Sequence, residues 1–242
     1  MKKTLIYFGL FAMTLTSCDE LTKITETANE ILSDSSAGLT NDEVIRGLKE
    51  ALKKGTEKAV STTAKTNGFN NNPLIKIPFP QEAIKIKEKA LQLGLSSQVQ
   101  QFETTLNRAA EEASKEAKNI FINAIMGMSI QDGFNILKGG DKAATDYLIK
   151  NTTASLKQKF APVVQRAIDK VELTKYWNPL ASKYNTAMTL TGGQQINQDL
   201  NAYVTQKAID GLFVYIAKEE KNIRDNPAAR VSDILKKVFG QQ

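Results

Sequence analysis

The 242-residue chain contains no histidine and one cysteine, Cys18. Without histidine it cannot build a Ser-His-Asp triad, a Cys-His pair or most zinc and di-iron sites. A lone cysteine leaves no disulfide within the chain. The sequence also lacks Ser-x-x-Lys, Gly-x-Ser-x-Gly, the glycine-rich phosphate loop and the Asp-rich calcium loop. We therefore expect a protein that is not an enzyme and that uses no cofactor and no metal.

The net charge is +6 and the pI is near 9.2. Such a balance is compatible with an anionic partner. However, the lysines are scattered among glutamates, and Lys2 and Lys3 lie in the leader described next. A solvated surface of mixed charge explains the pattern, and the expected location of the protein argues against a nucleic-acid partner.

The first 18 residues have the three parts of a bacterial export signal. Lys2 and Lys3 precede an apolar run from Leu5 to Leu15, which is about half the length that spans a bilayer. Leu15-Thr16-Ser17-Cys18 then resembles a lipobox, in which Cys18 becomes the lipidated first residue of the mature chain. Two or three acyl chains on one residue make membrane attachment effectively permanent. We expect a membrane partner through this anchor.

The destination is the cell envelope, with the outer membrane facing the periplasm as the first expectation. Acidic residues such as Asp19 and Glu20 after the lipidated cysteine resemble an inner-membrane retention signal in some Gram-negative bacteria and a surface-export signal in others. The inner membrane and the cell surface therefore remain alternatives.

Apolar residues between 98 and 128 recur in steps of three and four, which predicts one long α-helix. The middle of its apolar face is alanine, at Ala109, Ala110, Ala113 and Ala117. Alanine lets a neighbouring helix approach closely, so this stretch is expected to be the buried centre of a helical bundle.

The rest of the chain predicts an all-α fold with one extended, proline-containing connector at about 70–80. We expect residues 1–18 to be the signal peptide, 19–37 a tether with a short helix, and 38–242 a single helical domain. Helices are expected at about 41–65, 80–94, 130–137, 141–164, 172–190 and 196–224, with a short helix after Asn226-Pro227.

Asn107, Arg108, Glu111 and Glu112 form the candidate polar cluster of the central helix. Arg108 can reach both glutamates at helical spacing. One interpretation is structural, either an ion network on the helix surface or a buried polar cluster that clamps neighbouring helices, and another is a contact to an anionic ligand. A third interpretation pairs Glu111 or Glu112 with an acid such as Asp146 for glycoside cleavage. Arg108 would keep these glutamates ionised, which favours the structural interpretation.

Two aromatic residues, Trp177 and Tyr184, together with Tyr176, could line a sugar-stacking groove. Their helical spacing favours a place in the core instead.

Several segments together resemble the uncharacterised bacterial lipoproteins catalogued as domain of unknown function 4197. The segments that carry the resemblance, in chain order, are Gly68-Phe69, Ile77-Pro78, Asn107-Arg108-Ala109-Ala110-Glu111, Met128-Ser129, Ala144-Thr145-Asp146-Tyr147, Lys159-Phe160-Ala161-Pro162, Asn226-Pro227-Ala228-Ala229-Arg230 and Leu235-Lys236-Lys237-Val238-Phe239. The resemblance implies an exported helical lipoprotein. It brings no activity, substrate or catalytic residue.

The sequence thus predicts a lipid-anchored, non-catalytic binding or structural module that works on an envelope protein or ligand. Two alternatives stay open: a carrier that holds a lipid or other apolar ligand between its helices, and a carboxylate-dependent hydrolase of cell-wall glycan.

Overall fold

The computed structural model describes residues 40–92, 94–170, 173–196 and 199–226. The chain divides into two compact units, Met1–Thr40 and Asn41–Gln242, and all described residues except Thr40 belong to the second. The predicted signal peptide, Cys18, the tether and the helix after Asn226-Pro227 lie outside the described residues.

The second unit is α-helical, and none of its described residues forms a strand, so the prediction of an all-α fold is confirmed. The helices are α2 (Asn41–Thr63), the short 3₁₀ helix η1 (Gln81–Ala83), α3 (Ile84–Gln92), α4 (Ser96–Ser114), α5 (Ala117–Met126), α6 (Ile130–Lys138), α7 (Ala143–Lys170), α8 (Leu173–Thr191) and α9 (Leu200–Asp225).

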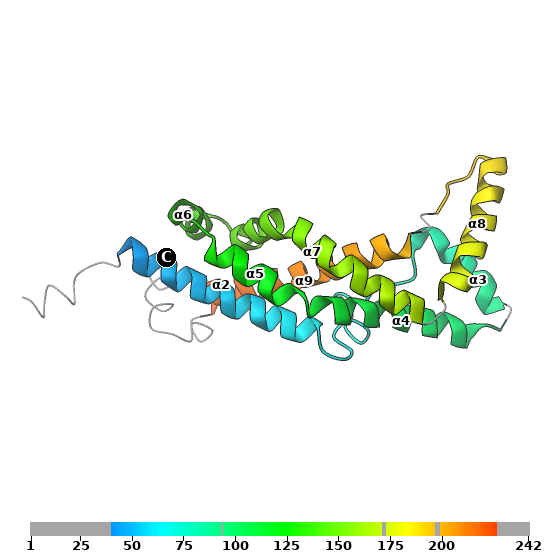
Figure 1. Ribbon diagram of the computed structural model, residues 1–242, viewed down its shortest axis with the longest axis horizontal. Coiled ribbons are helices and arrows are strands. Elements are labelled where there is room, and N and C mark those ends of the chain that lie inside the picture. Colours follow the sequence, from blue (N-terminus) through cyan, green and yellow to red (C-terminus); the bar gives the residue numbers. More distant parts are fainter. Residues whose placement is uncertain (1–39, 93, 171–172, 197–198, 227–242) are drawn as a thin grey trace, which may run out of the picture. The chain divides into compact units, whose positions relative to one another are not determined.

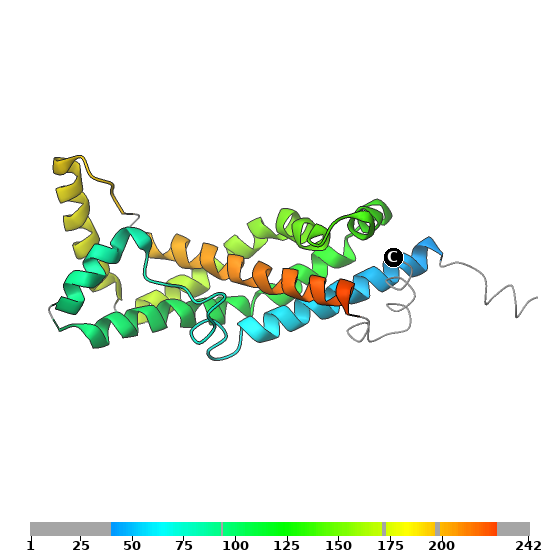
Figure 2. The same ribbon diagram turned by 180° about the vertical axis from the view of Figure 1, so that it is seen from behind.

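Four stretches of helix make the bundle. Helix α7 packs along α9 and α4, while α2 packs along α9 and α5 (Figure 1). Seen from behind, α9 runs beside α2 over part of its length (Figure 2). The core therefore lies between α2, α4–α5, α7 and α9, and its largest fully buried side chains include Phe121, Phe160 and Leu212.

The long central helix predicted over 98–128 is two consecutive helices, α4 and α5. At the junction the N–H groups of Lys115 and Glu116 donate to carbonyls three residues back, at 3.2 and 3.0 Å. Three-residue bonding of this kind is the tighter 3₁₀ pattern, which interrupts the regular α ladder. Both residues are good helix formers, so the sequence does not mark this interruption.

The alanine face is buried as predicted. Ala109, Ala110 and Ala113 of α4 and Ala117 of α5 are all 0% exposed, and α4 packs against α7 and α9. The small side chains let those helices come close to the centre of the bundle.

A non-helical connector is found where one was predicted, and it spans residues 64–80; residues 64–75 are mostly turns and bends, and residues 76–80 are irregular backbone. Its apolar side chains Phe69, Ile75, Ile77 and Phe79 are buried. Gly68 is required here, since a Cβ at this position would lie 2.4 Å from the carbonyl oxygen of Thr63. The connector therefore turns tightly against the end of α2 before it runs along the bundle.

Candidate functional site

Asn107 of the predicted polar cluster is 0% exposed and grips the connector. Its Oδ1 accepts from the N–H of Ile77 at 2.8 Å, and its Nδ2 donates to the carbonyl oxygen of the same residue at 2.9 Å. Nδ2 also donates to the carbonyl of Glu103 in the preceding turn, at 2.8 Å. The amide thus gives the isolated extended backbone the two hydrogen bonds that a neighbouring strand would supply.

Glu111 holds the same connector one helical turn further along. Its Oε1 accepts from the N–H groups of Phe69 and Asn70, at 3.1 and 3.2 Å. Its Oε2 accepts from Nη1 of Arg108 at 2.6 Å. The other guanidinium nitrogen, Nη2, donates to the Oδ1 of Asn67 at 3.0 Å.

Arg108 and Glu111 are unequally exposed, with 41% of the arginine side chain and 5% of the glutamate side chain accessible. A buried carboxylate needs charge-assisted partners. Glu111 has three, so the predicted interpretation of a polar clamp fits this part of the cluster. Its target is the connector and not a neighbouring helix.

Glu112 does not join this arrangement. Its side chain is 58% exposed and pairs with Lys115 on the outer surface of α4. The proposed partner acid Asp146 is an exposed residue near the start of α7. The structure therefore separates the predicted cluster into a buried clamp, formed by Asn107, Arg108 and Glu111, and one surface ion pair.

A second buried polar cluster was not predicted. Glu220 of α9 accepts from the N–H groups of Ala144 and Thr145 in the first turn of α7, at 3.0 and 2.8 Å, and from the Thr145 hydroxyl. Arg224 binds Glu220 and also donates to the carbonyl oxygen of Ile136 near the end of α6, at 2.9 Å. A carboxylate at a helix start and a cation at a helix end both match the helix dipole.

This second cluster joins the end of α6 to the start of α7. The only signal in the sequence is the four-residue spacing of Glu220 and Arg224, which is common on helix surfaces. Nothing in that spacing tells which helix ends the pair will cap.

The aromatic residues considered for sugar stacking do not form a groove in the described part of the chain. Trp177 is buried, with ring centroids 5.6 Å from Phe102 and 6.0 Å from Phe79. Tyr184 is half-buried in α8, and the Tyr176 side chain lies outside the description. The preference for a core role is confirmed for Trp177.

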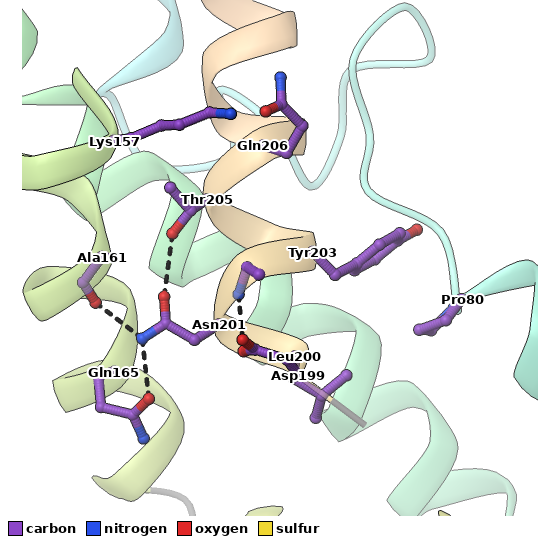
Figure 3. Close-up of a pocket in the computed structure, with 11 residues that line it drawn as sticks. Pro80, Lys157, Ala161, Gln165, Asp199, Leu200, Asn201, Tyr203, Thr205 and Gln206 are labelled. Carbon is purple, nitrogen blue, oxygen red and sulfur yellow. Dashed lines mark hydrogen bonds between the residues drawn. The ribbon is translucent and has the colours of Figure 1, made fainter. Parts of the chain in front are cut away.

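An open pocket of about 740 Å³ lies between α7 and the first turns of α9. Pro80, at the end of the connector, stands at its edge (Figure 3). This volume is within the roughly 300–1,000 Å³ that is typical of small-molecule sites. The lining combines apolar surface with these polar residues: Lys157, Gln165, Asp199, Asn201, Tyr203, Thr205 and Gln206.

Hydrogen bonds hold much of this lining in place. Asn201 Nδ2 donates to the Ala161 carbonyl at 2.9 Å and to Gln165 Oε1 at 2.8 Å, and its Oδ1 accepts from Thr205 at 3.1 Å (Figure 3). Asp199 caps α9 by accepting from the Ala202 N–H at 2.9 Å. The side chains of Asn201, Gln165 and Asp199 are therefore held by hydrogen bonds within the protein. Sequence reasoning missed the pocket because its residues come from three distant segments.

The described residues contain no group of three or more Cys, Asp or Glu side chains placed to hold a metal ion. Among the same residues, no single helix has both the length and the apolar character to cross a membrane. The bent pair of 96–126 and Ile130–Lys138 meets those criteria only when its parts are combined.

The model of a family described as "Protein of unknown function (DUF4197)" matches residues 38–240, which is most of the chain. The chain belongs to this family. The match agrees with the resemblance drawn from the sequence motifs, and it contains every residue of the clamp and the pocket. Comparison with curated proteins and with solved structures gave no match.

Proposed function

We propose that this DUF4197 protein is a lipid-anchored, non-catalytic binding module of the cell envelope, and that it binds its partner in the pocket between α7 and α9. The observation that carries the binding role is the pocket itself. It is large enough for a small ligand, and internal hydrogen bonds fix its polar lining.

The anchor rests on the sequence. A basic start, a short apolar run and Leu15-Thr16-Ser17-Cys18 stand in the order that lipoprotein export requires. The outer membrane, facing the periplasm, is the proposed location.

A non-catalytic role is supported by the engagement of Glu111. A general acid in glycoside cleavage needs a carboxyl group that can hold and release a proton at the substrate. Both oxygens of Glu111 are already bound by the connector and by Arg108, at distances of 2.6 to 3.2 Å. Its position therefore fits a structural task.

The anchor is tested with Cys18→Ser in cells fed labelled palmitate, with Ser17→Ala as the matched control. We expect label and firm membrane attachment in the control and neither in Cys18→Ser. Equal membrane attachment of the two variants would show that Cys18 is not the lipid anchor.

The binding role is tested in intact cells with a photo-crosslinking amino acid at position 206, in the pocket, and at position 101, on the exposed surface of α4. We expect a discrete adduct from position 206 and none from position 101. No adduct from the pocket position, or the same adduct from both positions, would contradict the proposal.

A further inference from the structure

We infer that the corner between α5 and α6 inserts its apolar side chains into the surface of the lipid bilayer that holds the anchor. This inference rests on the proposed lipid anchor and adds a second, direct contact between the helical domain and the membrane.

The corner presents large apolar side chains that the bundle leaves exposed. Helix α5 ends at Met126 and α6 begins at Ile130, and the direction of the helix changes by 103° across this break. Met126 is 67% exposed, Ile130 is 50% exposed, and Phe134, one turn further along α6, is half-buried. Met128 is only 3% exposed, so the turn itself is packed against the protein. We call Met126, Ile130 and Phe134 the apolar corner, and a group of this kind marks an interaction surface.

The apolar corner lies at the end of the bundle that the chain enters after Cys18. Residues 19–40 connect Cys18 to Asn41, the first residue of α2. Helix α6 packs on the first half of α2, where a Cβ on Gly133 would lie 2.2 Å from Cδ1 of Ile45. Figure 1 shows α6 at the same end of the bundle as the start of α2, with α3 and α8 at the other end. The anchor is therefore joined to the end of the domain that carries the apolar corner.

Two lysines border the apolar corner. Lys49 of α2 donates to the last carbonyl of α5 at 3.0 Å, and Lys138 Nζ lies 6.0 Å from the centroid of the aromatic ring in α6. At a membrane surface a lysine lays its alkyl stem along apolar groups while its ammonium reaches the phosphates of the lipids. The one acid of α6, Asp132, is engaged at the start of the helix, where it accepts from the N–H and hydroxyl of Ser129. The border of the corner thus suits the headgroup region of a bilayer.

A bilayer explains this small surface better than a protein partner does. A stable protein interface takes about 20–30 residues on each side, whereas the apolar corner consists of three. A domain that is already tied to the bilayer meets the lipid at a high effective concentration, so a few additional contacts are sufficient to orient it. The anchor would supply the attachment, and the corner would decide which end of the bundle faces the membrane.

The inference is tested with the full lipidated chain in vesicles of phosphatidylethanolamine and phosphatidylglycerol. Because lipidation consumes the thiol of Cys18, Ile130→Cys allows a single fluorescent nitrobenzoxadiazole label at position 130. The matched control is Leu190→Cys on α8, which replaces an apolar residue that is 83% exposed at the opposite end of the bundle. We expect nitroxide-bearing lipids to quench the label at position 130 and to leave the label at position 190 unquenched. The emission should move to shorter wavelength at position 130 only.

Met126→Glu supplies a second variant at an exposed position, and thermal melting checks its folding. Combined with the label at position 130 it should reduce the quenching, because a charged side chain resists burial in lipid. Leu190→Glu should change nothing.

The inference is wrong if the protein floats with the vesicles while the label at position 130 stays unquenched. Equal quenching at positions 130 and 190, or unchanged quenching in Met126→Glu, would also overturn it. Emission at shorter wavelength without quenching would show that protein, such as a second copy of this chain, covers the corner instead of lipid. In all of these cases the lipid anchor stands. A chain that does not float with the vesicles at all refutes the anchor, and this inference with it.

Discussion

The clamp formed by Asn107 makes a quantitative prediction about stability. In Asn107→Ala the N–H and carbonyl of Ile77 lose their partner, and Ile77 is 1% exposed, so bulk water does not replace it. Each buried polar group left without a partner costs about 1–3 kcal/mol. The carbonyl of Glu103 keeps its hydrogen bond within the helix, so its loss of the Asn107 amide adds little to the free-energy cost.

Asn107→Ala should therefore lower the free energy of unfolding by about 2 to 6 kcal/mol, with the lower end applying where one water molecule enters the space left by the amide. A single domain is typically stable by only about 5–15 kcal/mol. The loss is thus a large part of the total.

The matched control is Asn151→Ala on α7. Asn151 is exposed, and its Nδ2 makes one bond, to the Tyr147 carbonyl at 2.7 Å. Both substitutions give a helix the same gain in propensity. The difference between them therefore isolates the clamp, and the control should change stability by less than about 0.5 kcal/mol.

Urea denaturation followed by far-UV circular dichroism measures both variants against the native chain. Equal unfolding midpoints for Asn107→Ala and Asn151→Ala, at an unchanged slope, would refute the reasoning. In that case the connector would be held by its apolar side chains alone.

Three further predictions concern other parts of the bundle. Gly211→Ala should lower the free energy of unfolding by about 1–3 kcal/mol in urea, although alanine favours a helix more than glycine does. The reason is that its Cβ would lie 2.6 Å from the buried ring of Phe69. The control Gly140→Ala adds a Cβ with no atom within 4 Å and should leave stability unchanged. Glu220→Ala should cost about 3–5 kcal/mol in the same assay, because two N–H groups of α7 lose their acceptor and Arg224, whose side chain is 13% exposed, loses its carboxylate; a loss under about 1 kcal/mol would contradict this. The pKa of Asp132 is lowered by hydrogen bonds from the side chain and then the backbone of Ser129, so Ser129→Ala should raise that pKa toward its ordinary value in an NMR titration. Since the folded-state pKa is the lower one, the stability from this cap is present above the unfolded pKa and is lost as pH falls through the folded pKa.

The helical fold was predictable because apolar residues repeat at helical spacing over most of the chain. The predicted helix at about 41–65 is Asn41–Thr63, and the one at 130–137 is Ile130–Lys138, which begins at the expected cap, Ser129. Such periodicity reports which face of a helix is buried. It does not report a change to three-residue bonding, and so the junction at Lys115 was missed.

The candidate sites were predictable only in part. Asn107 and Glu111 stand out as polar residues near an alanine face, and the sequence indicates that they need partners. Those partners are backbone groups of Ile77, Phe69 and Asn70, and any residue type provides such groups. The sequence cannot specify a contact whose other half carries no side-chain signature.

Three of the eight motifs behind the family resemblance meet at one place in the structure. Gly68-Phe69 forms the tight turn, Ile77 is the residue gripped by Asn107, and Glu111 binds the N–H of Phe69. Three motifs that are far apart in the sequence thus describe a single contact between the connector and α4.

The pocket is not built from these motifs. Apart from Ala161, its lining lies outside those motifs, on the α7 and α9 surfaces and at Pro80. However, Pro80 ends the connector that Asn107 and Glu111 hold, and Tyr203 is tied to Pro78 in the same segment. The clamp therefore sets one wall of the pocket from a distance. If so, Asn107→Ala should weaken ligand capture at position 206 under conditions where the helices stay folded, whereas Asn151→Ala should leave that capture unchanged.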